Sequence, residues 1–395
     1  MKYAENYIRS SIAIIGLYQG DIPFAVFLKN YFSANKKFGS KDRKYITQIC
    51  YNYFRLAPVI RQEDLAIGIK IALFICNESI GEWASLFDEY WQKNWSGKLV
   101  DRVAFIQSNY ASVASLSIFP FNHLLSKDIN HHLFSLSHCI QPDLFIRVRP
   151  SKKEKVLDSL KAANCLFEIV QSNTIRLPNG TKLETIVTVD EDIVIQDLSS
   201  QRVGAMLEKI KTVNSINGFS VWDCCAASGG KSILAHDIFE NIQLTVTDIR
   251  KSILHNLESR LNRAGVHPLN SFLIDLSKPI DFNKSINKNQ FDLVICDAPC
   301  SGSGTWSRTP EQLSFFDEKK LAEFQQLQQQ ILTNIFPSIK KGGYLLYITC
   351  SVFEKENELV SQFVEAHLGA QLLEQKIIEG YTQKADTMFV ALFQF

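Results

Sequence analysis

The chain has 395 residues, more than one ordinary domain contains, so its length predicts two or three domains. Its 42 Lys and Arg residues nearly balance 41 Asp and Glu residues, and the net charge of +1 lacks the basic excess of most nucleic-acid-binding domains. Any RNA contact must therefore come from local basic patches. No apolar run approaches the roughly 20 residues of a membrane span, and Ile12 to Leu17 is too short for a signal peptide, so we expect a cytoplasmic protein.

Residues 1–135 are predicted to be helical, because apolar residues recur at three- and four-residue spacing, as at Ile46, Ile49 and Tyr53. A basic cluster stands out in this region. It consists of Lys36, Lys37, Lys41, Arg43, Lys44 and Arg55. Two interpretations stay open: a solvated helix face, or a surface that contacts phosphate groups.

Residues 140–200 predict a small α/β module, too short to be a catalytic unit. The run 144–148 is typical of a strand, and 152–163 has helical spacing with many charges. Beyond them, the stretch 174–189 predicts two strands joined by an Asn-Gly turn at Asn179 and Gly180.

Residues 201–395 alternate between short apolar runs and helical stretches, which predicts parallel strands joined by right-handed crossovers. The expected strands are 221–225, 244–247, 271–274, 291–296 and 344–349, followed by 370–375 and 388–395. The last two are closely spaced, so we expect one of them to run antiparallel at the edge of the sheet.

The first strand of this region leads directly into a glycine-containing turn, Ala226 to Lys231. Gly229 and Gly230 allow a ligand close to the backbone, and the helix that follows offers free N–H groups at its start. This signal alone is weak, because dehydrogenases and many other nucleotide-binding proteins share it.

Three acids sharpen the prediction, since Asp248, Asp275 and Asp297 each follow a predicted strand. A carboxylate after the second strand can accept hydrogen bonds from both ribose hydroxyls of an adenosine, and one after the third can meet the adenine amino group. A single Asp here is more often a helix N-cap. Three acids that each follow a strand favour an adenosine-containing cofactor bound at the carboxyl ends of the strands.

Cys300 and Cys350 are predicted at the same sheet edge, fifty positions apart in the chain. Core packing is the alternative explanation for both thiols. We expect no metal site, because neither cysteine belongs to a C-x-x-C pair and no histidine is near. Cys224 and Cys225 are adjacent on a predicted strand, so we expect their side chains to point to opposite faces.

Methylation at carbon 5 of cytosine is a reaction that needs a thiol. A thiolate that adds at carbon 6 turns the ring into an enamine, and carbon 5 can then attack a sulfonium methyl group. Asp297 or Lys231 could offset the charge that develops on the ring. A second cysteine could take the proton from carbon 5 before the thioether is eliminated.

The segments DCCAASGGKS, DAPCSGSGT and KKGGYLLYITCSVFEKENE resemble motifs of the Sun-family RNA (cytosine-5) methyltransferases. The resemblance implies S-adenosylmethionine as cofactor, Cys350 as nucleophile and Cys300 as the residue that releases the product. It also implies the cofactor-binding residues, which are Cys225, Ala226, Ala227, Ser228, Gly229, Gly230, Lys231, Asp248, Asp275 and Asp297. Arg308 and Pro310 match an R-x-P element, and QDLSSQ (196–201) resembles the segment that leads into the catalytic domain.

The segment GSKDRKYITQICYNYFR resembles the NusB-like helical domain of the bacterial ribosomal RNA small subunit methyltransferase B members of this family. The implied architecture is an all-α NusB-like RNA-binding domain (1–135), a small α/β, RRM-like module (140–200) and a Rossmann-like, seven-stranded methyltransferase domain (201–395). The implied product is 5-methylcytosine in 16S ribosomal RNA. We expect a monomer without metal or membrane partners.

Ser228 departs from the family pattern, which has proline at this position of C-A-A-P-G-G-K. Serine does not fix φ as proline does, so we expect a less constrained loop. Alternatives remain: an RNA-binding ribosome assembly factor with impaired catalysis, the same chemistry on transfer RNA or another RNA, and a dehydrogenase, which explains neither cysteine. DNA is a further possible substrate, although DNA cytosine methyltransferases place the nucleophile in the P-C element. Trp306 is a candidate for stacking on a flipped-out base.

Overall fold

The computed structural model describes residues 4–113, 117–214, 218–282, 286–288 and 290–395. The chain divides into two compact units. Unit 1 contains residues 1–123, 130–141 and 305–318, and unit 2 contains residues 124–129, 142–304 and 319–395. The segment 305–318 therefore leaves the sheet-containing unit and packs with the amino-terminal helices.

Unit 1 is helical, as the spacing of its apolar residues predicts. Its α-helices are α1 (Ala4–Leu17), α2 (Phe24–Ala34), α3 (Ser40–Ile60), α4 (Leu65–Cys76), α5 (Glu89–Lys93), α6 (Leu99–Asn109), α7 (His131–Ser137) and α13 (Gln312–Phe315). Short 3₁₀ turns lie at Gly81–Leu86, Ala111–Val113 and Asn122–Leu124. Asp42 fixes the start of α3, since its carboxylate accepts hydrogen bonds from the Gly39 N–H (2.8 Å) and from the hydroxyl of Tyr7 in α1 (2.7 Å).

The basic cluster separates into two parts. Five of its residues are exposed: Lys36, Lys37, Lys41, Arg43 and Lys44. Arg55 is only 1% exposed, and its guanidinium donates to the carbonyl oxygens of His138 (2.9 Å) and Ser307 (2.8 Å). Including Arg55 in a phosphate-contacting surface was therefore wrong, because the side chain instead ties α3 to the 305–318 segment.

Unit 2 begins with the small module. Its elements are β1 (Leu144–Val148), α8 (Lys153–Ala162), β2 (Glu168–Gln171), β3 (Thr174–Leu177) and β4 (Ile193–Ile195). The strands form an antiparallel sheet in the order β2-β3-β1-β4. The predicted strand and helix at 144–148 and 152–163 are confirmed.

The predicted hairpin around Asn179 and Gly180 is wrong. The chain turns there, but residues 181–187 form no strand, and β3 pairs instead with the preceding β2. Leu183 and Val187 are buried in the module core without joining the sheet. Their alternating apolar pattern reflects packing in the core. Periodicity alone cannot distinguish such a buried loop from a strand.

The remainder of unit 2 surrounds a seven-stranded sheet. Its strands are β5 (Phe219–Asp223), β6 (Ile242–Asp248), β7 (Asn270–Leu273), β8 (Phe291–Asp297), β9 (Ile339–Thr349), β10 (Gln371–Ile378) and β11 (Met388–Gln394). Its helices are α9 (Leu198–Arg202), α10 (Gly204–Val213), α11 (Gly230–Phe239), α12 (Lys251–Arg263), α14 (Lys320–Ile335) and α15 (Glu358–Leu368). Short 3₁₀ turns lie at Ser303–Thr305, Phe336–Ser338 and Tyr381–Gln383.

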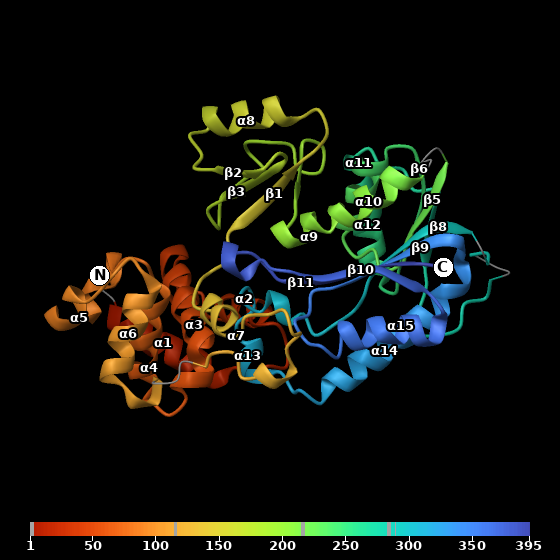
Figure 1. The fold of residues 1–395 in the computed structure, drawn as a ribbon. Helices are drawn as coiled ribbons and strands as arrows, with labels where there is room; N and C mark the ends of the chain where they lie inside the picture. The colour runs from red at the N-terminus through yellow and green to blue at the C-terminus, as the bar shows by residue number, and fades with distance from the viewer. Residues whose placement is uncertain (1–3, 114–116, 215–217, 283–285, 289) are drawn as a thin grey trace. The chain divides into compact units, whose positions relative to one another are not determined.

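The strand order is β10-β11-β9-β8-β5-β6-β7, and the pairs from β9 to β7 are parallel. This confirms the Rossmann-like α/β prediction. The antiparallel strand is β11, which lies between β9 and β10 rather than at the edge. One of the last two strands is antiparallel, as predicted, but its predicted position at the edge is wrong, because the last strand inserts between β9 and β10. Figure 1 shows α14 and α15 on one face of the sheet and α10 to α12 on the other.

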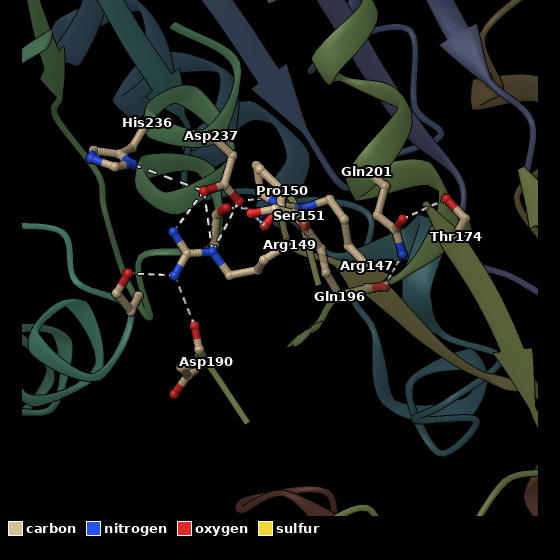
Figure 2. Close-up of polar contacts among 12 residues, drawn as sticks. Arg147, Arg149, Pro150, Ser151, Thr174, Asp190, Gln196, Gln201, His236 and Asp237 are labelled. Atoms are coloured by element: carbon tan, nitrogen blue, oxygen red, sulfur yellow. Dashed lines mark hydrogen bonds and ion pairs between the residues drawn. The ribbon is translucent and has the colours of Figure 1, made fainter. Parts of the chain in front are cut away.

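The small module is joined to the sheet through α11 by charged groups (Figure 2). Arg147 of β1 and Arg149 both bind the carboxylate of Asp237 in α11, at 2.5 Å and 2.7 Å. All three side chains are at most 10% exposed. Burial alone would raise the pKa of Asp237, but hydrogen bonds from His236 and Arg149 and the charge of Arg147 lower it to about 2. The junction is thus a buried ion-pair cluster.

No helix among the described residues is both long enough and apolar enough to cross a membrane.

Candidate functional site

The carboxyl ends of five parallel strands meet at one edge of the sheet. The loops that leave this edge carry the predicted functional residues. They are Cys225 to Lys231 after β5, Asp248 at the end of β6, Asp275 after β7, Asp297 at the end of β8 with Cys300 just beyond, and Cys350 after β9. The parallel register therefore collects residues that are more than a hundred positions apart in the sequence.

The loop between β5 and α11 is shaped by its glycines and by one strained residue. Gly229 has φ +80°, and a Cβ there would lie 2.5 Å from Leu257 Cδ1. Ala227 has a positive φ of 45°, a conformation that costs energy for a residue with a side chain. The loop is thus held in a conformation that brings its backbone to the surface of the site, as close approach of a ligand requires.

Ser228, which replaces the family proline, is held by a neighbouring helix. The Arg260 guanidinium of α12 donates to both the carbonyl oxygen and the hydroxyl of Ser228, each at 3.0 Å. Arg260 also pairs with Asp190 at 2.7 Å. Hydrogen bonds to the loop thus supply a restraint that proline would provide through its ring.

Asp248 connects the loop to β6. Its carboxylate accepts hydrogen bonds from the Ala227 N–H (3.1 Å) and from the backbone and side chain of Arg250 (2.9 and 3.1 Å). The Arg250 side chain is 59% exposed. Ribose hydroxyls could replace this exposed guanidinium as donors to the same oxygens, so the residues present fit an adenosine-containing cofactor.

Asp275 lies two residues beyond β7, and its side chain is 30% exposed. The Ser277 hydroxyl (2.6 Å) and N–H (3.1 Å) donate to its carboxylate, and these bonds lower the pKa of Asp275. Ile274 N–H donates to the Asp248 carbonyl (3.2 Å), which places this turn beside the end of β6. Asp275 is thus an ionised carboxylate at the outer end of the site.

Lys231 and Asp297 form an ion pair within the site. Lys231 Nζ lies 3.0 Å from Asp297 Oδ2 and 2.7 Å from the Ser200 hydroxyl. The lysine side chain is 8% exposed and the aspartate side chain 31% exposed. The pair therefore places a partly exposed carboxylate and a buried cation at this edge of the sheet.

Cys300 and Cys350 meet at this edge, with their sulfur atoms 3.3 Å apart. Both are partly buried. The contact with Cys350, together with burial, raises the pKa of Cys300 well above its usual value. The raised pKa favours the protonated thiol form of Cys300.

A buried polar cluster that the sequence did not predict supports the two cysteines. Glu356 is 0% exposed, and its carboxylate accepts from the Ser301 N–H (2.8 Å), the Ser301 and Ser351 hydroxyls (both 2.5 Å) and Gln328 Nε2 (3.1 Å). Ser301 follows Cys300 and Ser351 follows Cys350, so one carboxylate ties both cysteine loops together. The only sequence signal was the ENE run after T-C-S.

Asp223, at the end of β5, was also missed. It is 0% exposed, and the Ser232 hydroxyl of α11 donates to its carboxylate at 2.6 Å. Burial raises the pKa of Asp223 to about 7. Its bond to Ser232 fixes the start of α11 relative to β5 and so fixes the ends of the cofactor loop.

Two predictions about side-chain placement were wrong. Trp306 is 1% exposed and packs against Phe119 and Phe316 in unit 1, so it is core rather than a free surface for stacking on a base. The side chains of Cys224 and Cys225 do not diverge, because both lie in a turn beyond the last residue of β5. Their sulfur atoms lie within 4.8 Å of each other and of Cys296.

A model of the family described as 16S rRNA methyltransferase RsmB/F matches residues 210–393. The matched RsmB/F segment contains the cofactor loop, the three acids and both cysteines of the site.

Two named relatives are similar over part of their length. A 181-residue stretch, 46% of this chain, is 33% identical to ribosomal RNA small subunit methyltransferase B of Photorhabdus laumondii and covers 40% of that protein. A 236-residue stretch, 58% of this chain, is 29% identical to a probable ribosomal RNA small subunit methyltransferase B of Bacillus subtilis and covers 51% of it. The chain thus spans about half the length of these relatives.

Solved structures share the fold of this chain. The crystal structure of PH0851 has a TM-score of 0.69 at 18% identity, with 98% of both chains covered. A methyltransferase homolog protein from Pyrococcus horikoshii has a TM-score of 0.55 at 20% identity, with 73% of this chain and 97% of that chain covered. NSun6 from Pyrococcus horikoshii, solved with SFG, also has a TM-score of 0.55, at 15% identity, covering 67% of this chain and 94% of that one.

Proposed function

We propose that this chain transfers a methyl group from S-adenosylmethionine to carbon 5 of a cytosine in RNA, with 16S ribosomal RNA as the substrate. The observation that carries the proposal is the 3.3 Å approach of the Cys300 and Cys350 sulfur atoms at the sheet edge from which the cofactor loop also leaves. The family matched by residues 210–393 and the names of the relatives support an RNA substrate.

The proposed cofactor residues follow from the geometry of the loop. In this proposal, the backbone at Gly229 and the helix start at Gly230 would hold the methionine part of the cofactor, Asp248 would accept from the ribose hydroxyls, and Asp275 would bind the adenine. S-adenosylmethionine, when bound, supplies a sulfonium methyl group.

Cys350 is proposed as the nucleophile. Its thiolate forms a bond to carbon 6 of the cytosine, and the electron pair of the carbon 5–carbon 6 double bond becomes available at carbon 5. Asp297 pairs with Ile348, two residues before Cys350, so the Lys231–Asp297 pair lies at the same strand ends and can stabilise the charge that moves onto the ring. Carbon 5 then takes the methyl group and keeps its hydrogen until a base removes it.

Cys300 is proposed as that base, and its pKa explains the order of events. In the free pair, the contact with Cys350 and burial raise the pKa of Cys300, so Cys300 keeps its proton. Once Cys350 has become a thioether, its thiol contact no longer raises the pKa of Cys300, which can then lose its proton to solvent. The resulting thiolate takes the proton from carbon 5, the double bond re-forms and the carbon 6–sulfur bond breaks.

Methyl transfer from labelled S-adenosylmethionine to 16S ribosomal RNA, followed by bisulfite sequencing, tests the proposal. The expected result is a protected cytosine that disappears with Cys350→Ser and persists with Cys165→Ala, a partly buried cysteine of the small module. Labelling of transfer RNA instead would overturn the choice of substrate. Binding of RNA without heat on titration with S-adenosylmethionine would indicate an assembly factor rather than an enzyme.

A further inference from the structure

Three thiols lie close together at the start of the cofactor loop, and none of them belongs to the Cys300–Cys350 pair. The sulfur atoms of Cys224, Cys225 and Cys296 all lie within 4.8 Å of one another. Cys296 belongs to β8, and the Cys224 N–H donates to the carbonyl oxygen of Ile295 at 2.9 Å. This bond fixes Cys224 beside Cys296, while the turn after Asp223 brings the Cys225 side chain to the same place.

The spacing fits coordination by a soft metal ion. A tetrahedral zinc–thiolate site has Zn–S distances of about 2.3 Å, which corresponds to sulfur–sulfur distances of about 3.8 Å. The three sulfur atoms would have to close by no more than roughly 1 Å, which side-chain rotation supplies. Thiolate ligands select ions such as Zn²⁺ and Cu⁺ over hard cations.

The burial of the three residues suits a site with one open position. Cys224 is 1% exposed and Cys296 is 0% exposed, whereas Cys225 is partly exposed at the start of the loop. An ion held by all three would reach solvent on the Cys225 side, where water can complete its coordination.

We propose that Cys224, Cys225 and Cys296 form a three-thiolate binding site for a soft metal ion of the Zn²⁺ type. On binding, each sulfur that is still a thiol loses its proton to solvent as its bond to the metal forms. The ion would tie the end of β5 to the end of β8, the two strands that carry the cofactor loop and Asp297. Occupancy should therefore stabilise the fold, and this effect requires neither RNA nor methyl transfer.

Cd²⁺ is the probe of choice, because thiolate–Cd²⁺ charge transfer absorbs in the ultraviolet. The test uses the full chain with Cys300→Ser and Cys350→Ser, which removes the other close sulfur pair. The expected result is one tightly bound equivalent and a rise in the thermal unfolding midpoint. Adding Cys224→Ala and Cys296→Ala should abolish both signals. Adding Cys76→Ala and Cys165→Ala, which removes the same number of thiols elsewhere, should abolish neither.

Equal Cd²⁺ binding by both sets of variants, or none by the protein with the three thiols intact, would overturn the proposal. A measurement on the unmodified chain covers the case in which the alanine variants fail to fold. Zn²⁺ should slow alkylation of the partly exposed Cys225 at least tenfold, as read by peptide mass spectrometry, and leave Cys165 unaffected. An unchanged rate at Cys225 would also contradict the site.

Discussion

The buried ion-pair cluster between the small module and α11 predicts a large effect of a small substitution. Asp237→Asn keeps the shape of the side chain but removes the charge that holds Arg147 and Arg149. Lowering the pKa of Asp237 from 3.8 to about 2 corresponds to about 2.5 kcal/mol of stabilisation in the folded state. Removing one partner of a buried pair typically costs about 3–5 kcal/mol, because the other charge stays buried without compensation.

We therefore expect Asp237→Asn to lower the free energy of unfolding by about 3 kcal/mol at neutral pH, measured by urea unfolding followed by circular dichroism. Hydrogen exchange of β1 should also become faster, because the module loses its anchor. The matched control is Asp158→Asn on α8, whose side chain is 78% exposed, so it should change stability by less than about 0.5 kcal/mol. A loss below about 1 kcal/mol for Asp237→Asn, with unchanged exchange in β1, would refute the reasoning.

The carboxylate of Asp237 also predicts that the stability of the fold decreases in acid. The pKa of Asp237 is lower in the folded chain than in the unfolded chain, so its stabilising contribution is present above about pH 4. It is lost as the pH falls toward about 2, where the folded-state carboxylate is protonated. The stability of the unmodified chain and that of Asp237→Asn should therefore converge in acid, and a constant difference between pH 7 and pH 2 would contradict this assignment.

Two further substitutions address the site directly. Gly229→Ala places a methyl group 2.5 Å from Leu257 Cδ1, so we expect at least tenfold weaker S-adenosylmethionine binding by calorimetry. Gly265→Ala, also at positive φ but with nothing within 4 Å of the added Cβ, should leave binding unchanged, and equal effects of the two would contradict the steric argument. Lys231→Met removes the cation paired with Asp297 and should lower kcat roughly 100-fold in single-turnover methyl transfer. Unchanged turnover would exclude Lys231 from the chemistry.

The sequence predicted the sheet well because buried parallel strands are continuous apolar runs, and β5 to β9 each overlap a predicted run. It also predicted which residues gather at one edge, since the carboxyl ends of parallel strands share that edge. It could not predict the pairing of β2 with β3, because β2 is largely exposed and lacks an apolar pattern. Residues 183–187 have the apolar pattern of a strand but do not form one, because their apolar side chains fill the module core instead.

The remaining errors concern side chains whose environment is set by distant segments. Arg55 is buried because it meets carbonyl oxygens from two other parts of unit 1, and Trp306 because the 305–318 segment packs among aromatic residues of that unit. The Glu356 cluster depends on the approach of two loops that are about fifty residues apart. The side chains of Cys224 and Cys225 were expected to point to opposite faces because the predicted strand ended at residue 225. β5 ends two residues earlier, at Asp223, so both cysteines lie in the turn and their side chains come together.

The central claim is that Cys350 attacks the base and Cys300 releases the product. Incubating each variant with S-adenosylmethionine and substrate RNA, followed by denaturing electrophoresis, tests it most directly. Cys300→Ser should accumulate a covalent protein–RNA adduct, because the attack by Cys350 still occurs but elimination does not. Cys350→Ser should form no adduct and transfer no methyl group. An adduct with Cys350→Ser and normal turnover by Cys300→Ser would contradict the account.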